Sequence, residues 1–98
     1  MTIEKTLNGA ELTVVVAGRL DTITAPELES SLWESNTRVS KLVLELVALA
    51  YVSSAGLRVI LQAQKTMNKQ GEMVIRNVNE SINEVFEVTG FIDILTIE

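Results

Sequence analysis

The chain contains 98 residues, of which 47% are hydrophobic, and its formal net charge is −5. This length is enough for a single domain over residues 1–98, and the acidic balance argues against nucleic-acid binding while it suits a basic protein partner. The absence of cysteine and histidine excludes disulfides, thiolate chemistry and the commonest general base and metal ligand. No stretch of about 20 apolar residues and no signal peptide is recognisable, so we expect a cytoplasmic protein.

The N-terminal residues have the pattern of a β-hairpin. Residues 2–7 form a short candidate strand, and the dipeptide Asn8-Gly9 that follows is a strong turn signal. Residues 11–18 are rich in β-branched side chains, which favour a strand. We therefore expect the two strands to pair through this turn.

An amphipathic helix is predicted after the hairpin. Thr24 is a candidate N-cap, Pro26 falls in the first turn, and Glu27 would complete a capping box with Thr24. Trp33, the only tryptophan, is expected to flank the core from this helix. The apolar positions recur at helical spacing and predict about three turns; they are Ala25, Leu28 and Leu32.

The middle of the chain contains a buried strand followed by a helix. Residues 41–47 are apolar on both faces except at Glu45, as in a central, covered strand. We expect this strand to run on through residues 48–50 to a pair of serines. A helix is predicted from Ser54 to about residue 70, with Gly71 as its stop. Its apolar positions are Leu57, Ile60, Leu61 and Met67.

The last part of the chain continues the alternation of strands and helices. We predict a strand over residues 72–76, a short helix over residues 81–88 that Gly90 ends, and a last strand over residues 94–97. The resulting order is ββαβαβαβ, and the right-handed preference of its parallel crossovers packs helices on the sheet. The expected fold class is therefore an α/β sandwich.

Ser53 and Ser54 lie between the central strand and the second helix, and a serine nucleophile there would need a base. Without histidine only Ser-Lys schemes are left. Lys41, Lys65 and Lys69 read as solvated positions that the sequence does not bring beside the serines, and no phosphate-binding glycine-rich loop is present. We therefore predict a protein that is not an enzyme and that has no catalytic residues, metal or bound cofactor.

Two roles are compatible with the position of the serines. A serine just before a helix is a favoured N-cap, worth about 1 kcal/mol, which accounts for Ser53. The hydroxyl of Ser54 then has no obligatory structural role, and the free N–H groups of a helix start favour negative charge there. The small residues Ala55 and Gly56 would let a partner approach closely. Arg58, one helical turn after Ser54, is either a solvated residue or a contact for a phosphate.

Three segments give the chain a family resemblance over nearly its whole length. They are GRLDTITAPELE at residues 18–29, LVLELVALAYVSSAGLRVIL at residues 42–61 and VFEVTGFIDILTI at residues 85–97. On these motifs the chain resembles the STAS domain family, and within it the small stand-alone anti-sigma factor antagonists. The resemblance implies a STAS-type sandwich, with a mixed sheet of about five strands and helices packed mainly on one face, and no catalytic activity.

The resemblance also implies a phosphorylation site. In this family a partner kinase, which is also the anti-sigma factor and supplies ATP and Mg²⁺, phosphorylates the helix start, and a metal-dependent serine phosphatase removes the phosphate. The family's best-known motif, Asp-Ser-Ser-Gly-Leu, aligns its aspartate with Ser53, its first serine with Ser54 and its usual acceptor with Ala55. Members that read Ser-Ser-Ala-Gly-Leu-Arg are similar to this chain and imply Ser54 as the acceptor, with Ser53 in reserve. Glu45 stands where the family usually has an aspartate.

The implied function is that of an anti-sigma factor antagonist switched off by serine phosphorylation. The unphosphorylated form would bind the kinase, and we expect a monomer. One alternative is a non-phosphorylated subunit that binds the ATPase of a membrane lipid transporter, and another is an autonomous Ser-Lys enzyme. For Asp21 a purely structural role, organising the turn with Thr24, is the alternative to partner contact. The expected partner-binding residues are Asp21, Thr22, Ser53, Ser54, Gly56 and Arg58.

Overall fold

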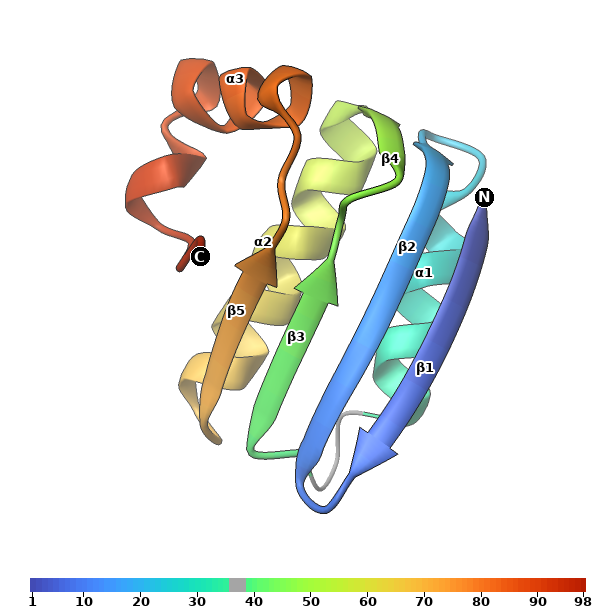
Figure 1. The fold of residues 1–98 in the computed structure, drawn as a ribbon, viewed down its shortest axis with the longest axis vertical. Helices are drawn as coiled ribbons and strands as arrows, with labels where there is room; N and C mark the ends of the chain where they lie inside the picture. Colours follow the sequence, from blue (N-terminus) through green and yellow to red (C-terminus); the bar gives the residue numbers. More distant parts are fainter. Residues whose placement is uncertain (36–38) are drawn as a thin grey trace.

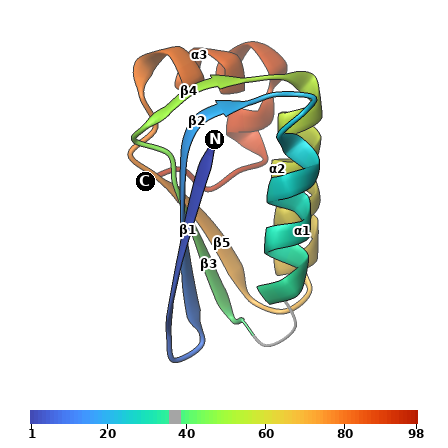
Figure 2. The same ribbon diagram turned by 90° about the vertical axis from the view of Figure 1, so that its right-hand side faces the viewer.

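The fold has two layers and a helical end, and the computed structural model describes it for residues 1–35 and 39–98. Helices α1 (Ala25–Ser35) and α2 (Ser54–Asn68) cover one face of a mixed sheet, whereas α3 (Glu80–Thr89) lies across one end of it, as Figure 1 and Figure 2 show. Side chains are described outside residues 33–38, so the prediction for Trp33 lies outside the described part.

The sheet contains five strands. As predicted, β1 (Thr2–Asn8) and β2 (Glu11–Leu20) form an antiparallel hairpin. β3 (Lys41–Glu45) pairs parallel to β2, and β5 (Glu72–Arg76) pairs parallel to β3, which gives the order β1-β2-β3-β5. β4 (Leu49–Val52) lies off this path and pairs only with β2 among the described strands. The α/β class with a five-stranded mixed sheet is therefore confirmed.

β2 is long enough to serve two parallel partners in succession. Its first half, from Glu11 to Val15, is in register with β3. The register shifts between Gly18 and Arg19, and the last residues of β2, up to Leu20, pair with β4. β2 therefore fixes both the start of β3 and the end of β4, and β4 leads directly into α2.

The prediction of one strand from residue 41 through residue 50 was wrong, because the chain makes two strands there. β3 ends at Glu45, where a turn begins in which the Leu49 N–H donates to the Leu46 carbonyl oxygen at 3.1 Å. The turn moves the chain from the first half of β2 to its second half. β4 was missed because it continues the same apolar run, and only the two-part pairing with β2 separates the strands.

The hydrophobic core lies between the helix pair and the sheet. On β2 the side chains alternate, and those on the helix side are buried. β3 is buried on both sides, as its apolar run predicted, with Val43 fully covered between Thr13 of β2 and Val74 of β5. No helix within the described ranges is long and apolar enough to cross a bilayer. The buried apolar side chains of the helix pair are Ala25, Leu28 and Leu32 of α1, and Leu57, Val59, Ile60, Ala63 and Met67 of α2. Ile82 and Phe86 of α3 are buried as well.

The order of elements at the C-terminal end also differs from the prediction. Gly90, with φ of 80°, ends α3 as expected, and a 3₁₀ turn, η2 (Phe91–Asp93), follows it. The strand predicted over residues 94–97 does not form, because these residues make a turn, a bend and one bridge. Only a single bridge between Ile75 and Ile97 joins this segment to β5. The observed order is therefore ββαββαβα, because β4 is gained and the last strand is lost.

The end of α2 is set by a close approach of two backbones. α2 stops at Asn68, three residues before the glycine that was predicted to end it. A Cβ at Gly71 would lie 1.8 Å from the carbonyl oxygen of Ser40. The glycine is therefore required by contact with the segment that starts β3, and the Glu72 N–H confirms this contact by donating to the same oxygen at 3.0 Å.

Candidate functional site

One hydrogen bond brings the loop after β2 beside the start of α2. The Ser53 N–H donates to the Leu20 carbonyl oxygen at 2.8 Å, directly after the register pair Leu20–Val52. Two segments that are about thirty residues apart in the sequence therefore end together at one edge of the molecule, where Figure 1 shows β2, β4 and the first turn of α2 meeting.

Ser53 is the N-cap of α2, as predicted. Its Oγ accepts from the Gly56 N–H at 3.2 Å, its carbonyl oxygen accepts from the Leu57 N–H at 2.9 Å, and its backbone is extended. Ser54 is the first helical residue and is exposed. Within the described part of the chain the N–H groups of Ser54 and Ala55 have no hydrogen-bond acceptor. The two serines thus divide their roles, with one bound to the backbone and one facing solvent.

Gly56 contributes to the site by packing, because it is buried. A Cβ at this position would lie 2.7 Å from Cγ of Leu20 and 3.0 Å from the Leu20 carbonyl oxygen. The glycine thus allows the first turn of α2 to lie against the end of β2. We predicted that the small size of Gly56 lets a partner approach closely. This location does not support that prediction, because Leu20 fills the space beside the glycine.

Asp21 and Thr24 form the reciprocal pair that was predicted for Thr24 and Glu27. The Asp21 Oδ1 accepts from the Thr24 N–H at 3.0 Å, and the Thr24 Oγ1 accepts from the Asp21 N–H at 2.9 Å. The Thr24 hydroxyl also donates to the Arg19 carbonyl oxygen at 2.8 Å. This is the reciprocal pattern of a capping box, placed three residues earlier than expected and with a carboxylate as one of the acceptors. The structural role considered for Asp21 is therefore present.

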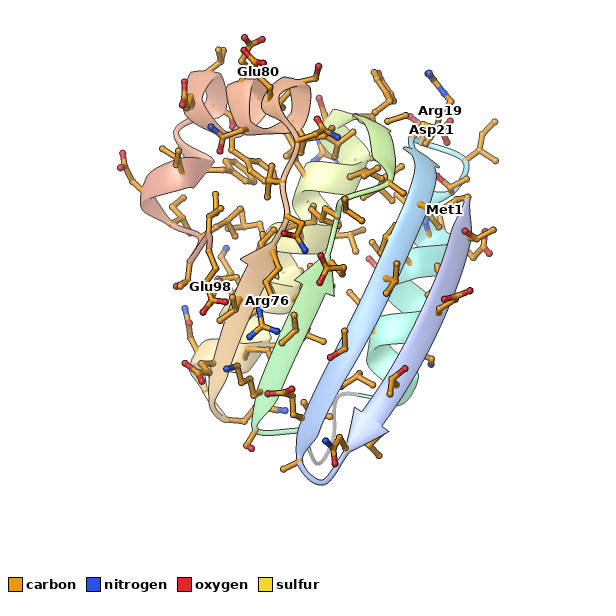
Figure 3. All side chains as sticks on the ribbon, in the orientation of Figure 1. Met1, Arg19, Asp21, Arg76, Glu80 and Glu98 are labelled. Carbon is orange, nitrogen blue, oxygen red and sulfur yellow. The ribbon has the colours of Figure 1, made fainter. Side chains whose placement is uncertain are left out.

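The electrostatics of this loop depend on the Asp21 carboxylate. The backbone hydrogen bond from Thr24 lowers the pKa of Asp21 below its ordinary value of 3.8; desolvation opposes the shift, and the Ile23 N–H adds to it. Arg19 contributes more weakly from 3.9 Å, between its Nε and the Asp21 Oδ2. The Arg19 guanidinium also lies 4.2 Å from the centre of the Tyr51 ring on β4. Figure 3 shows Arg19 and Asp21 together at the end of β2.

A shallow hollow of about 210 Å³ lies between the first turns of α1 and α2, with one residue of the loop at its edge. It brings Thr22 and Arg58, both exposed and both predicted partner contacts, to the rim of one depression. Arg58 lies one turn after Ser54 and therefore on the same side of α2. The hollow is lined by Thr22, Ala25, Pro26 and Glu29 from the loop and α1, and by Ala55, Arg58 and Val59 from α2.

Sequence reasoning missed two exposed side chains at this site. Ile23 lies in the loop between Asp21 and Thr24 and exposes 87% of its surface, and Tyr51 beneath Arg19 exposes 41%. A signal for Ile23 was present, because it is an apolar residue outside the helical spacing of Ala25, Leu28 and Leu32. Tyr51 carried no such signal, since its strand was not recognised.

The lysines within the described residues have other positions or partners than Ser54. Lys65 and Lys69 lie about 16 Å and about 22 Å along α2 from Ser54, at 1.5 Å per residue. Lys41 pairs with Glu11 and Glu72 where β3 begins, and Lys5 bonds the Ser31 carbonyl oxygen. Over residues 1–35 and 39–98 no three carboxylates gather as metal ligands. Glu45 lies away from Ser54 as well, and accepts a hydrogen bond from the Asn77 amide.

Known proteins resemble this chain in sequence and in fold. The STAS domain profile matches residues 2–98. BtrV of Bordetella bronchiseptica is 35% identical over 88 residues, which cover 88% of this chain and 76% of BtrV. The anti-sigma-B factor antagonist of Staphylococcus aureus is 32% identical over 99 residues, which cover 97% of this chain and 90% of that protein.

A solved structure agrees with the observed topology. The crystal structure of an anti-sigma factor antagonist from Mycobacterium paratuberculosis superposes with a TM-score of 0.89 and covers 98% of this chain and 83% of that one. Its sequence identity of 21% means that this likeness concerns the fold alone.

The division of roles between the serines predicts unequal stabilities for two alanine variants. Ser53→Ala removes the acceptor of the Gly56 N–H, so we expect a loss of about 1 kcal/mol in the free energy of unfolding. Ser54→Ala removes an exposed hydroxyl and should stay within about 0.5 kcal/mol. Urea unfolding followed by circular dichroism measures both. A larger loss for Ser54→Ala would show that the cap has been misassigned.

The lowered pKa of Asp21 predicts a loop that loosens in acid. Because the folded pKa lies below the unfolded one, the carboxylate stabilises the loop above the unfolded value, and this contribution is lost as the pH falls through the folded pKa. In an NMR titration the Ile23 and Thr24 amide shifts should move together with a midpoint below 3.8.

Asp21→Asn is the matched control for this titration, because it keeps an oxygen acceptor but does not titrate. The amide shifts of Ile23 and Thr24 should therefore stay flat over the same range in this variant. A midpoint at or above 3.8, or the same curve in Asp21→Asn, would mean that Asp21 does not hold the loop.

Proposed function

The chain belongs to the STAS domain family and, within it, to the anti-sigma factor antagonists, and we propose that it binds an anti-sigma factor that is also its serine kinase. Antagonists of this family are binding proteins without catalysis of their own. The proposal adds the partner, the site and the switch: the unphosphorylated chain binds, and phosphorylation of Ser54 ends binding.

The observation that carries the proposal is the exposed hydroxyl of Ser54 at the first residue of α2. Ser53 already caps the helix, so modification of Ser54 leaves the cap in place. A kinase can reach this hydroxyl without local unfolding, since the side chain already faces solvent. Ser53 remains the reserve acceptor, but its Oγ would first have to give up the Gly56 N–H.

The docking surface combines the end of β2 with the start of α2. Asp21 and Thr22 belong to the capped loop, and Ser54 and Arg58 to the facing turn of α2. The kinase would cover this surface with its ATP-binding side and would supply ATP, Mg²⁺ and the catalytic groups. Gly56 contributes indirectly, because its close contact with Leu20 sets the distance between the end of β2 and the start of α2.

A phosphate on Ser54 would be tolerated by this fold while it changes the surface. The N–H groups of Ser54 and Ala55 and the Arg58 side chain are available to it, and a helix start favours negative charge. Residues 77–98 hold five of the 13 acidic residues and none of the eight basic ones, so the rest of the chain, Ser54 included, is formally neutral. About two added negative charges would therefore dominate the local surface.

Charge and desolvation explain why the phosphorylated form would leave its partner. A kinase that has just transferred a phosphate holds nucleotide phosphates at the same face, so like charges would meet across the interface. The phosphoserine would also have to lose its hydration there. A metal-dependent serine phosphatase would restore the binding form, in the cytoplasm where sigma factors act. Direct contact with nucleic acid has no part in this cycle.

The proposal predicts opposite effects of two substitutions at Ser54. Ser54→Asp should weaken binding of the host anti-sigma factor kinase at least about tenfold, because it adds charge within the proposed docking surface. Ser54→Ala should bind within about threefold of the unmodified chain, because the hydroxyl is not needed for docking. Isothermal calorimetry with the purified kinase measures both affinities.

Asn8→Asp controls for total charge, since it adds the same charge at the exposed hairpin turn, at the other end of β2. It should bind like the unmodified chain. Equal affinities for Ser54→Asp and Ser54→Ala would contradict the switch. Recovery of a lipid-transporter ATPase in place of a kinase, when the chain is used as bait in its host, would favour the transporter subunit instead.

A further inference from the structure

The loop between β2 and α1 presents an apolar side chain at the docking surface. Ile23 exposes 87% of its surface, although it is a branched aliphatic residue next to buried Ala25. Single exposed apolar residues are common on protein surfaces, so exposure alone means little. What sets Ile23 apart is the backbone that carries it and the surface around it.

The backbone of Ile23 is held in place before any partner arrives. Its N–H donates to the Asp21 Oδ1 at 3.0 Å, and the N–H of Thr24 donates to the same oxygen. The Ala25 N–H donates to the Asp21 carbonyl oxygen at 2.8 Å, which closes the turn behind it. A side chain on a fixed loop loses little entropy when it is buried, so it gains more from an interface than one on a loose segment.

The loop that carries Ile23 adjoins the hydroxyl that the switch modifies. The Ser53 N–H and the Leu20 carbonyl oxygen join the loop to the start of α2, and Thr22 and Ala55 line the same hollow. Within this loop Ile23 is the apolar residue between Thr22 and Thr24, and Arg58 lines the same hollow as Thr22. Protein interfaces commonly combine a buried apolar residue with polar residues around it, and this loop offers that composition.

We propose that Ile23 is the apolar anchor by which this chain docks, and that its anti-sigma factor partner carries an aliphatic pocket which receives it. This inference rests on the proposed function and adds a source of affinity that the switch does not supply. Burial of Ile23 gives binding strength, whereas the charge state of Ser54 decides whether binding occurs. The loop that bears Ile23 lies beside Ser54. The pocket must therefore lie beside the site from which the kinase transfers phosphate.

A graded series at position 23 tests the anchor against the purified host kinase by calorimetry. Loss of one buried methylene in Ile23→Val should weaken binding about fourfold, and Ile23→Ser should weaken it about 10- to 100-fold. Both variants should fold normally, because the side chain is exposed in the free protein. Val88→Ser on α3 is the matched control, since Val88 is also branched and also exposes 87% of its surface. It should bind like the unmodified chain.

Ser54→Asp measured in the same series separates this inference from the proposed function. If Ser54→Asp binds weakly while Ile23→Ser binds normally, the anchor is wrong and the switch stands. If Ile23→Ser and Val88→Ser lose affinity equally, the effect comes from general surface apolarity and the anchor is again wrong. If Ser54→Asp and Ile23→Ser both bind normally, the docking surface lies elsewhere and both proposals fail.

Discussion

The hydrogen bond from the Ser53 N–H to the Leu20 carbonyl oxygen is the contact on which the site depends. It continues the parallel pairing of β2 with β4 by one residue beyond Val52, at the point where the chain leaves the sheet for α2. Parallel strands end at the same edge, so the loop after β2 and the first turn of α2 must emerge together. The packing of Gly56 against Leu20 then fixes how closely they approach.

In the candidate site, some side chains form hydrogen bonds that stabilise the loop and the start of α2. Other side chains face solvent and take no part in these bonds. Ser53 caps α2 and Asp21 closes the loop with Thr24, so both side chains are occupied within the fold. The side chains of Ser54 and Ile23 are exposed instead, and each follows closely on a residue whose side chain is hydrogen-bonded within the fold. A modification or a contact at these two residues therefore changes the surface and leaves the supporting structure unchanged.

Much of this arrangement could be predicted from local patterns, and the failures have a common physical cause. The hairpin, the cap at Ser53 and the glycine stop at Gly90 depend on neighbours in sequence, and each was found. The break between β3 and β4 depends on which half of β2 each strand meets, and the last predicted strand is reduced to one bridge with Ile75 of β5. Both depend on pairing with segments distant in sequence, so neither is visible in an apolar run.

The start of α2 at the serine pair could be predicted because its motif lies in one short stretch. Sequence reasoning did offer Thr24 as the structural partner of Asp21, and the structure contains that pair. It could not supply the inward direction of Gly56, because the contact with Leu20 joins segments that are far apart in the sequence. It also missed the exposure of Ile23, although this residue falls outside the helical spacing.

The central claim is that Ser54 is the residue a kinase modifies. Intact-mass and fragment mass spectrometry of the chain purified from its own host, across growth conditions, tests it most directly. The account predicts a single phosphate mapped to Ser54 in at least one condition, with Ser53 unmodified. A phosphate on Ser53, or no phosphate under any condition, would contradict it.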